Sequence, residues 1–224
     1  IFLPQIMTNI VNVYDPSSYM LIDTIYFYPN ISILYFDMDL FQNFAIVDAT
    51  SLHLLLFHGS TINITLDNVN LYGGVCISDQ YVIGLGPLST IKVFSKFTGQ
   101  HLYDLIGFGL FLESCIVINN YLYVPTGVGL QIADLRQQNN SLIKTLNDTV
   151  SSKGFWSIYM DASGRFYGDC WRSPAQSMIF YISNNNISIQ LVAIPIFTRI
   201  IARASKYKYT FLNVTTTQIM IYEY

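Results

Sequence analysis

Short stretches in which apolar and polar residues alternate recur along the whole chain of 224 residues. Alternation with a period of two predicts a β-strand that buries one face. Six such stretches look like copies of one strand, and no long helical pattern competes with them; they cover residues 11–15, 53–57, 91–95, 131–134, 178–181 and 219–222. The pattern therefore predicts an all-β protein.

The six stretches are spaced at intervals close to 40 residues. A second marker shares this period, because a polar dipeptide followed within three residues by Phe or Tyr recurs at 42–43, 79–80, 119–120, 163–164 and 205–206. A repeat of about 40 to 45 residues is the length of one four-stranded propeller blade. Because a single sheet of this size cannot bury both faces, we expect the units to stack around an axis.

The repeat divides the chain into units at roughly 1–30, 31–68, 69–111, 112–152, 153–195 and 196–224 of a single domain spanning 1–224. The second unit shows four predicted strands, at 31–37, 44–48, 52–57 and 62–66. The first unit supplies at least its third and fourth strands, and the last supplies its first three. We therefore predict a β-propeller of five or six four-stranded antiparallel blades, whose terminal sheets need a neighbouring chain or segment to complete them.

Two segments carry a family resemblance. Residues 89–105 contain a strand, a Thr-Gly turn and a second strand, and residues 11–25, which read VNVYDPSSYMLIDTI, follow a similar pattern. These segments resemble the β-propeller repeat families of the WD, YVTN and quinoprotein-like kinds. The chain departs from the WD kind because it lacks the Trp-Asp dipeptide and a Gly-His signature, so the resemblance implies the fold and not a function.

The composition points to an extracellular glycoprotein. Charged residues make up only 11% of the chain, against roughly 25% in an ordinary soluble domain. Six Asn-x-Ser/Thr sequons exceed the two or three expected by chance at roughly this Asn content, and hydrated glycans would keep so uncharged a surface soluble; they begin at Asn30, Asn63, Asn139, Asn147, Asn186 and Asn213. We expect a secreted or cell-surface protein, and the start at Ile1 suggests a removed leader.

Several classes of partner are disfavoured by the sequence. The net charge of -3 gives no basic footprint for nucleic acid. No apolar run reaches the roughly 18 residues of a membrane-spanning helix. His53, His58 and His101 do not form a metal-binding pattern, and no phosphate loop, dinucleotide fingerprint or nucleophile elbow is present. We expect no cofactor and no metal.

The three cysteines, Cys76, Cys115 and Cys170, allow at most one internal disulfide. Cys76 and Cys115 both lie in apolar strand contexts, which is typical of buried thiols. We therefore expect at least one of the three cysteines to be a buried free thiol.

Two groups of residues are candidates for function. Trp171 and Arg172 lie in a predicted loop and, with Trp156, could form an aromatic platform for a sugar or protein partner. Asp37 and Asp161 occupy comparable positions on predicted inner strands, with Asp39, Asp169 and Arg172 near them in sequence. Two carboxyl groups at a defined separation are what glycoside hydrolysis requires.

The favoured interpretation is a non-enzymatic binding or assembly module. Low charge, many aromatic residues, sequons and incomplete terminal sheets are expected of a glycoprotein that packs against copies of itself, as in a surface layer or filament. Protein partners, copies of the same chain above all, are expected, and carbohydrate is a further candidate ligand. The alternative is a carbohydrate-active hydrolase of propeller fold that uses Asp37 and Asp161.

Overall fold

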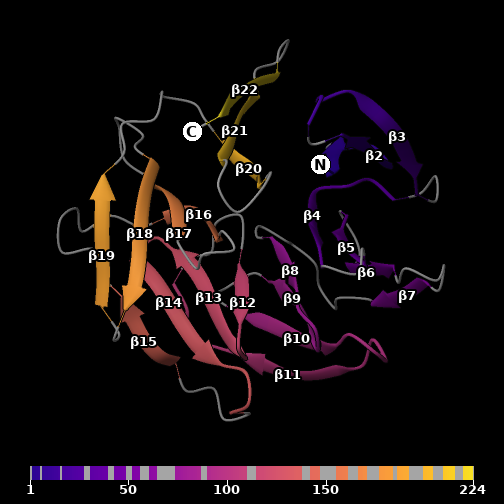
Figure 1. Ribbon diagram of the computed structural model, residues 1–224. Coiled ribbons are helices and arrows are strands. Elements are labelled where there is room, and N and C mark those ends of the chain that lie inside the picture. Colours follow the sequence, from indigo (N-terminus) through magenta and orange to yellow (C-terminus); the bar gives the residue numbers. More distant parts are fainter. Residues whose placement is uncertain are drawn as a thin grey trace.

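A computed structural model shows small β-sheets that follow one another around a ring in chain order (Figure 1). It describes residues 2–223 except for 6, 16, 28–30, 40–42, 49–51, 56–60, 65–73, 87–89, 110–114, 138–141, 147–154, 161–165, 171–176, 184–185, 192–198, 204–208 and 215–218. After residue 145, it describes the backbone of the strands but only one side chain, that of Ile158.

The described residues form six antiparallel sheets, which we call blades 1 to 6. Blade 1 holds β1 (Phe2–Gln5), β2 (Ile10–Tyr14) and β3 (Leu21–Tyr26). Blade 2 holds β4 (Tyr35–Met38), β5 (Phe44–Val47), β6 (Leu52–Leu55) and β7 (Thr61–Ile64). Blade 3 holds β8 (Val75–Ile77), β9 (Tyr81–Leu85), β10 (Ile91–Ser95) and β11 (His101–Leu105).

The remaining blades continue the same order. Blade 4 holds β12 (Ile116–Ile118), β13 (Tyr121–Thr126), β14 (Gly129–Asp134) and β15 (Leu142–Leu146). Blade 5 holds β16 (Phe155–Met160), β17 (Phe166–Cys170), β18 (Ser177–Ser183) and β19 (Asn186–Leu191). Blade 6 holds β20 (Arg199–Arg203), β21 (Tyr209–Val214) and β22 (Ile219–Glu223). Every sheet is a meander, in which each strand pairs with the next along the chain.

The fold class predicted from the sequence is confirmed. The recurring stretches fall on β2, β6, β10, β14, β18 and β22. Five of these are the third strand of their sheet. β2 is the middle strand of the three-stranded blade 1, and it corresponds to a third strand if blade 1 lacks the first of four strands. The repeated dipeptides fall between the first and second strands of blades 2 to 6.

One strand begins later than predicted. β4 starts at Tyr35 rather than at residue 31, because Ile33 pairs with blade 1 instead. Met7 N–H donates to the carbonyl of Ile33 at 2.7 Å, and Ile33 N–H donates to the carbonyl of Thr8 at 2.8 Å. Ile31 and Ile33 are buried between blades 1 and 2. This segment joins the two blades before the inner strand of blade 2 begins.

The hydrophobic core lies between consecutive blades. Ile91 and Val93 of β10 pack in a cluster shared with blade 4, whereas Phe94 of the same strand packs in a cluster shared with blade 2. Successive side chains of a strand point to opposite faces. The sheet of blade 3 therefore buries both of its faces, one against each neighbour.

The first strands of successive sheets contact one another, β4 with β8, β8 with β12 and β12 with β16. These are the inner strands of the ring, and a disulfide links two of them. Cys76 on β8 is bonded to Cys115, which directly precedes β12. Both cysteines are buried as expected, and their bond is the one internal disulfide that three cysteines allow. The predicted free thiol can then only be Cys170, whose side chain lies outside the described residues. Neighbouring inner strands bring two positions that are 39 residues apart to a Cα–Cα separation of 5.6 Å.

We expect this disulfide to contribute substantially to stability. The disulfide closes a loop of 39 residues. Closing a loop of this length reduces the conformational entropy of the unfolded chain and so raises the free energy of unfolding by about 4 kcal/mol. The double variant Cys76→Ala/Cys115→Ala should lose about that much free energy of unfolding in a urea titration. In denaturant, Cys76 and Cys115 should resist alkylation until a reductant is added; labelling of either cysteine before reduction would contradict the disulfide.

Candidate functional site

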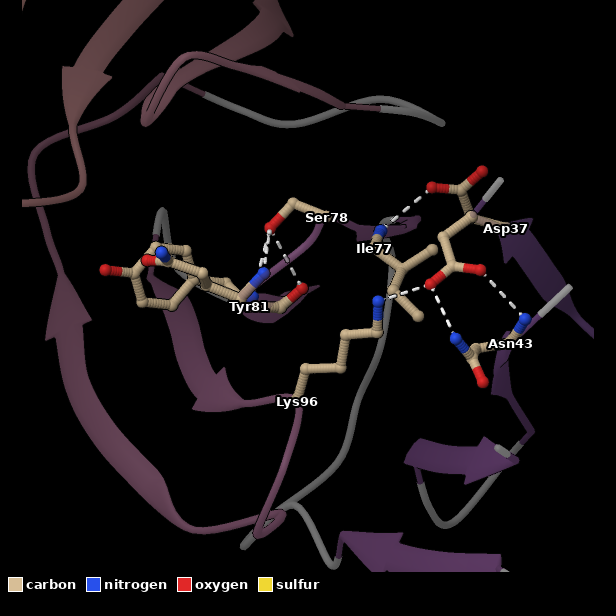
Figure 2. A network of polar contacts seen from close by, with 8 residues as sticks. Asp37, Asn43, Ile77, Ser78, Tyr81 and Lys96 are labelled. Carbon is tan, nitrogen blue, oxygen red and sulfur yellow. Dashed lines mark hydrogen bonds and ion pairs between the residues drawn. The ribbon is translucent and has the colours of Figure 1, made fainter. Parts of the chain in front are cut away.

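A cluster of polar residues lies where blade 2 meets blade 3, and we call it the seam cluster (Figure 2). It consists of Asp37 on β4, Asp39 just after β4, Asn43 just before β5, Ile77 at the end of β8 and Lys96 just after β10. Its members thus come from two blades and meet at the ends of their strands. An apolar cluster of the same two blades includes Val47, Val75 and Phe94.

The turn after β10 places Lys96. Ser95 accepts a hydrogen bond from Gly99 N–H, and Gly99 has a φ of 70°, which glycine adopts without strain. Lys96 N–H donates to the carbonyl of Gln80 at 2.9 Å, and this bond fixes the turn to the first hairpin of the same blade. The Lys96 side chain then extends toward blade 2, as Figure 2 shows.

Lys96 and Asp39 form a buried ion pair between the two blades. Their side chains are 6% and 4% exposed, and the Lys96 ammonium donates to Oδ2 of Asp39. Asn43 completes the site, since its backbone N–H donates to Asp39 Oδ1 at 2.9 Å and its side-chain amide donates to Oδ2 at 2.7 Å. Burial alone would raise the pKa of Asp39, but the hydrogen bonds from Asn43 and Lys96 outweigh it and hold that pKa below its usual value.

Asp37 lies two residues earlier on β4 and has the opposite electrostatic environment. Its Oδ2 accepts a hydrogen bond from Ile77 N–H of β8 at 2.9 Å. Burial raises the pKa of Asp37 to about 7, an effect that the hydrogen bonds from Ile77 and Met38 oppose and the nearby charge of Asp39 reinforces. Two carboxyl groups on one strand thus have pKa values that are pushed apart.

The shifted pKa of Asp37 has a definite sign for stability. A carboxyl whose folded pKa lies above its unfolded value keeps its proton in the folded protein while the unfolded chain releases it. The contribution of Asp37 to the free energy of unfolding is therefore largest below about pH 4 and declines until about pH 7. Asp39, whose folded pKa is lowered, contributes stability at neutral pH that is lost on acidification.

The structure describes only some of the residues predicted for function. Asp37 lies in the seam cluster, while its predicted partner Asp161 lies outside the described residues. Asp161 directly follows β16 as Asp39 directly follows β4, so Asp39 is its counterpart in sequence. Trp171 and Arg172 lie outside the described residues, and Trp156 is described only as part of the β16 backbone. The predicted aromatic platform is therefore not tested.

The sequons divide in the same way. Asn63 lies in β7, Asn186 in β19 and Asn213 in β21, with their backbones described and their side chains not. The other three, Asn30, Asn139 and Asn147, lie outside the described residues. β7 and β19 are the outer strands of their sheets.

Two histidines form contacts within their own blades. His53 on β6 pairs with Asp48 at 2.7 Å, and His101 pairs with Asp104 on β11 at the same distance, while His58 lies outside the described residues. No group of metal-ligating side chains occurs within the part of the chain that the structure describes. Within that part, no helix has the length and apolar character that a membrane crossing requires.

Sequence reasoning missed Lys96 and Asn43. One signal for Lys96 was available, because the corresponding residue after β14 is Leu135, whose N–H donates to the carbonyl of Asn120 as that of Lys96 donates to Gln80. Leu135 is buried. A lysine at a repeat position that is otherwise apolar predicts a buried ammonium that needs an anionic partner.

Comparison with known proteins supports the fold and nothing finer. No protein-family model and no curated protein matches the sequence. Many solved structures are similar, among them the following three. A chain of the mitotic checkpoint complex matches with a TM-score of 0.63 and 12% identity over 82% of this chain and 58% of that one. The C-terminal WD40 domain of Sif2 matches with a TM-score of 0.61 and 15% identity over 92% of this chain and 59% of that one.

The third structure, the computationally designed Ika4 protein, matches with a TM-score of 0.52 and 12% identity over 69% of this chain and 93% of that one. The chain therefore has a β-propeller fold. More particularly, its blades are arranged as in WD40 propellers, although it spans less than two thirds of the length of the first two matched chains. At these identities the likeness concerns the fold alone.

Removal of the seam ammonium provides a test of the buried ion pair. The variant Lys96→Met leaves the Asp39 carboxylate buried without its cation, so the free energy of unfolding should fall by about 3–5 kcal/mol. The double variant Lys96→Met/Asp39→Asn removes both charges and should recover part of that loss. Urea unfolding followed by circular dichroism measures both values, and equal losses in the two variants would contradict a buried pair.

Proposed function

We propose that the protein is a secreted or cell-surface glycoprotein whose propeller binds other proteins, copies of itself above all, without catalysing a reaction. The observation that carries this proposal is the apolar rim of the outer strands. Ile22 and Tyr26 of β3 are 62% and 70% exposed, and Leu102 and Ile106 of blade 3 are 43% and 55% exposed. Both blades thus expose apolar side chains, and exposed apolar groups are candidates for protein contact.

These rim residues occupy equivalent places in their blades. Ile22 and Leu102 are each the extra residue at an irregularity in the pairing of the last two strands of their blades. Tyr26 and Ile106 each lie four residues farther along the chain. Because the same positions are apolar and exposed in two separate repeats, the rim offers a periodic surface, which suits assembly with a repeated partner.

Two further features support an extracellular setting. Disulfides form and persist in oxidising compartments, and Cys76–Cys115 is one that joins two inner strands. The sequons Asn63 and Asn186 lie in β7 and β19, the outer strands of their sheets. The low proportion of charged residues, 11%, gives a further reason for hydrated glycans on the surface.

Light scattering after size separation tests self-association. The wild-type protein should elute with a mass well above 25.5 kDa plus its sugars. The variant Ile22→Lys/Leu102→Lys places charges on the rim, so it should dissociate at concentrations at least about tenfold higher than the wild type does. The matched control Thr98→Lys adds a charge to an exposed turn and should leave the mass unchanged. A wild-type protein with the mass of one chain would refute self-association.

A hydrolase is the second candidate, and one observation favours it. The pKa of Asp37 is raised to about 7 while that of Asp39 is lowered, and a divergent pair of this kind is what a general acid and its ionised partner need. Against it, both carboxyl groups are engaged in hydrogen bonds within the seam. Cleavage of an oligosaccharide that the variant Asp37→Asn abolishes would favour this candidate over binding alone.

A further inference from the structure

We propose that Asp37 is a proton-controlled clasp between blades 2 and 3, in which the neutral side chain holds the end of β8 and ionisation loosens that contact. This inference concerns how the ring opens and does not depend on the proposed function. Its basis is the hydrogen bond from Ile77 N–H to Asp37 Oδ2, which joins the inner strands of two blades. A protonated carboxyl keeps a carbonyl-type oxygen, so this hydrogen bond survives protonation.

The charges around Asp37 do not compensate its ionisation. Asp39 lies two residues after Asp37, just beyond β4. Its negative charge disfavours a second negative charge on Asp37. The Lys96 ammonium of blade 3 is bound to Asp39. The other two strands packed here contribute no charged side chain, because β5 reads FAIV and β8 reads VCI. Within the described residues, no ion pair of Asp37 is present.

Asp37 is half-buried, so its ionised carboxylate is better solvated when the seam opens. Its hydrogen bonds from Ile77 and Met38 favour the charged form, but burial outweighs them and raises the pKa to about 7. Water that reaches the carboxylate in an opened seam restores the usual pKa near 4. By linkage, the equilibrium for local opening must rise with pH between these two values.

The position of the clasp shows why this seam can respond and the next one cannot. Asp37 is the second-last residue of β4, and Cys76 is the second-last residue of β8. Both point to the inner strand of the following blade, Asp37 through a hydrogen bond and Cys76 through a covalent bond. Equivalent positions thus join blades 2 and 3 reversibly and blades 3 and 4 permanently.

Amide hydrogen exchange at Ile77, followed by NMR between pH 6 and pH 8, tests the clasp. After correction for the pH dependence of the exchange chemistry itself, protection of the wild-type amide should fall by about tenfold across this range. In the variant Asp37→Asn, which retains a side-chain carbonyl but cannot ionise, this additional loss should disappear. The amide of Leu135, which bonds to Asn120 within blade 4, should show no additional loss in either protein.

A matched variant separates the clasp from a general effect of charge. Asp104→Asn removes an exposed carboxyl from β11 and should leave the pH dependence at Ile77 as in the wild type. If Asp37→Asn fails to fold, Asp37→Ser supplies the same comparison with a smaller acceptor. The clasp is refuted if wild-type Ile77 shows no additional loss of protection, or if the loss persists in a variant that has no carboxyl at position 37.

Discussion

Each blade of this protein depends on its neighbours, because a sheet of three or four short strands cannot cover both of its own faces. Blade 3 shows the constraint clearly, since Val93 and Phe94 are adjacent on β10 and are buried in two different clusters. The residues of one strand therefore stabilise two interfaces at once. The free energy of the fold resides largely between the sheets and less within them.

Polar groups placed in such an interface must find partners across it. Lys96 and Asp39 do so as an ion pair, and Asn43 supplies the remaining donors to the carboxylate. Replacing such a pair by apolar residues is often neutral for stability, so we attribute to this pair the alignment of the two blades and not a large gain in stability. The seam cluster fixes one blade against the next at a defined register of strand ends, which apolar packing alone specifies less sharply.

The strands could be predicted from the sequence because their signal is local. Alternation along residues 91–95 identified β10 without any knowledge of its neighbours, and the period near 40 residues identified the propeller. The start of β4 could not be predicted, since residue 33 is an ordinary apolar residue whose pairing with Met7 and Thr8 is decided by blade 1. Tertiary contacts of this kind override a local pattern.

The contacts of the candidate site were hidden for a related reason. Asp37 was identified as a candidate, but its partner Ile77 is 40 residues away and contributes only a backbone N–H, which no side-chain motif reveals. The cysteines paired across 39 residues. Both separations equal about one repeat, because equivalent positions of adjacent blades lie side by side on the inner strands. In a propeller sequence, therefore, residues one period apart are the first pairs to examine for a disulfide or a hydrogen bond.

The seams also differ in how much opening they permit, and this follows from the chemistry at one repeated position. A disulfide at Cys76 keeps blades 3 and 4 joined in every native fluctuation, whereas the hydrogen bond at Asp37 can break and reform. Of these two seams, the one between blades 2 and 3 is therefore expected to open at the lower free energy. Because the covalent link keeps blades 3 and 4 together, opening at the seam between blades 2 and 3 would leave the packing between blades 3 and 4 in place.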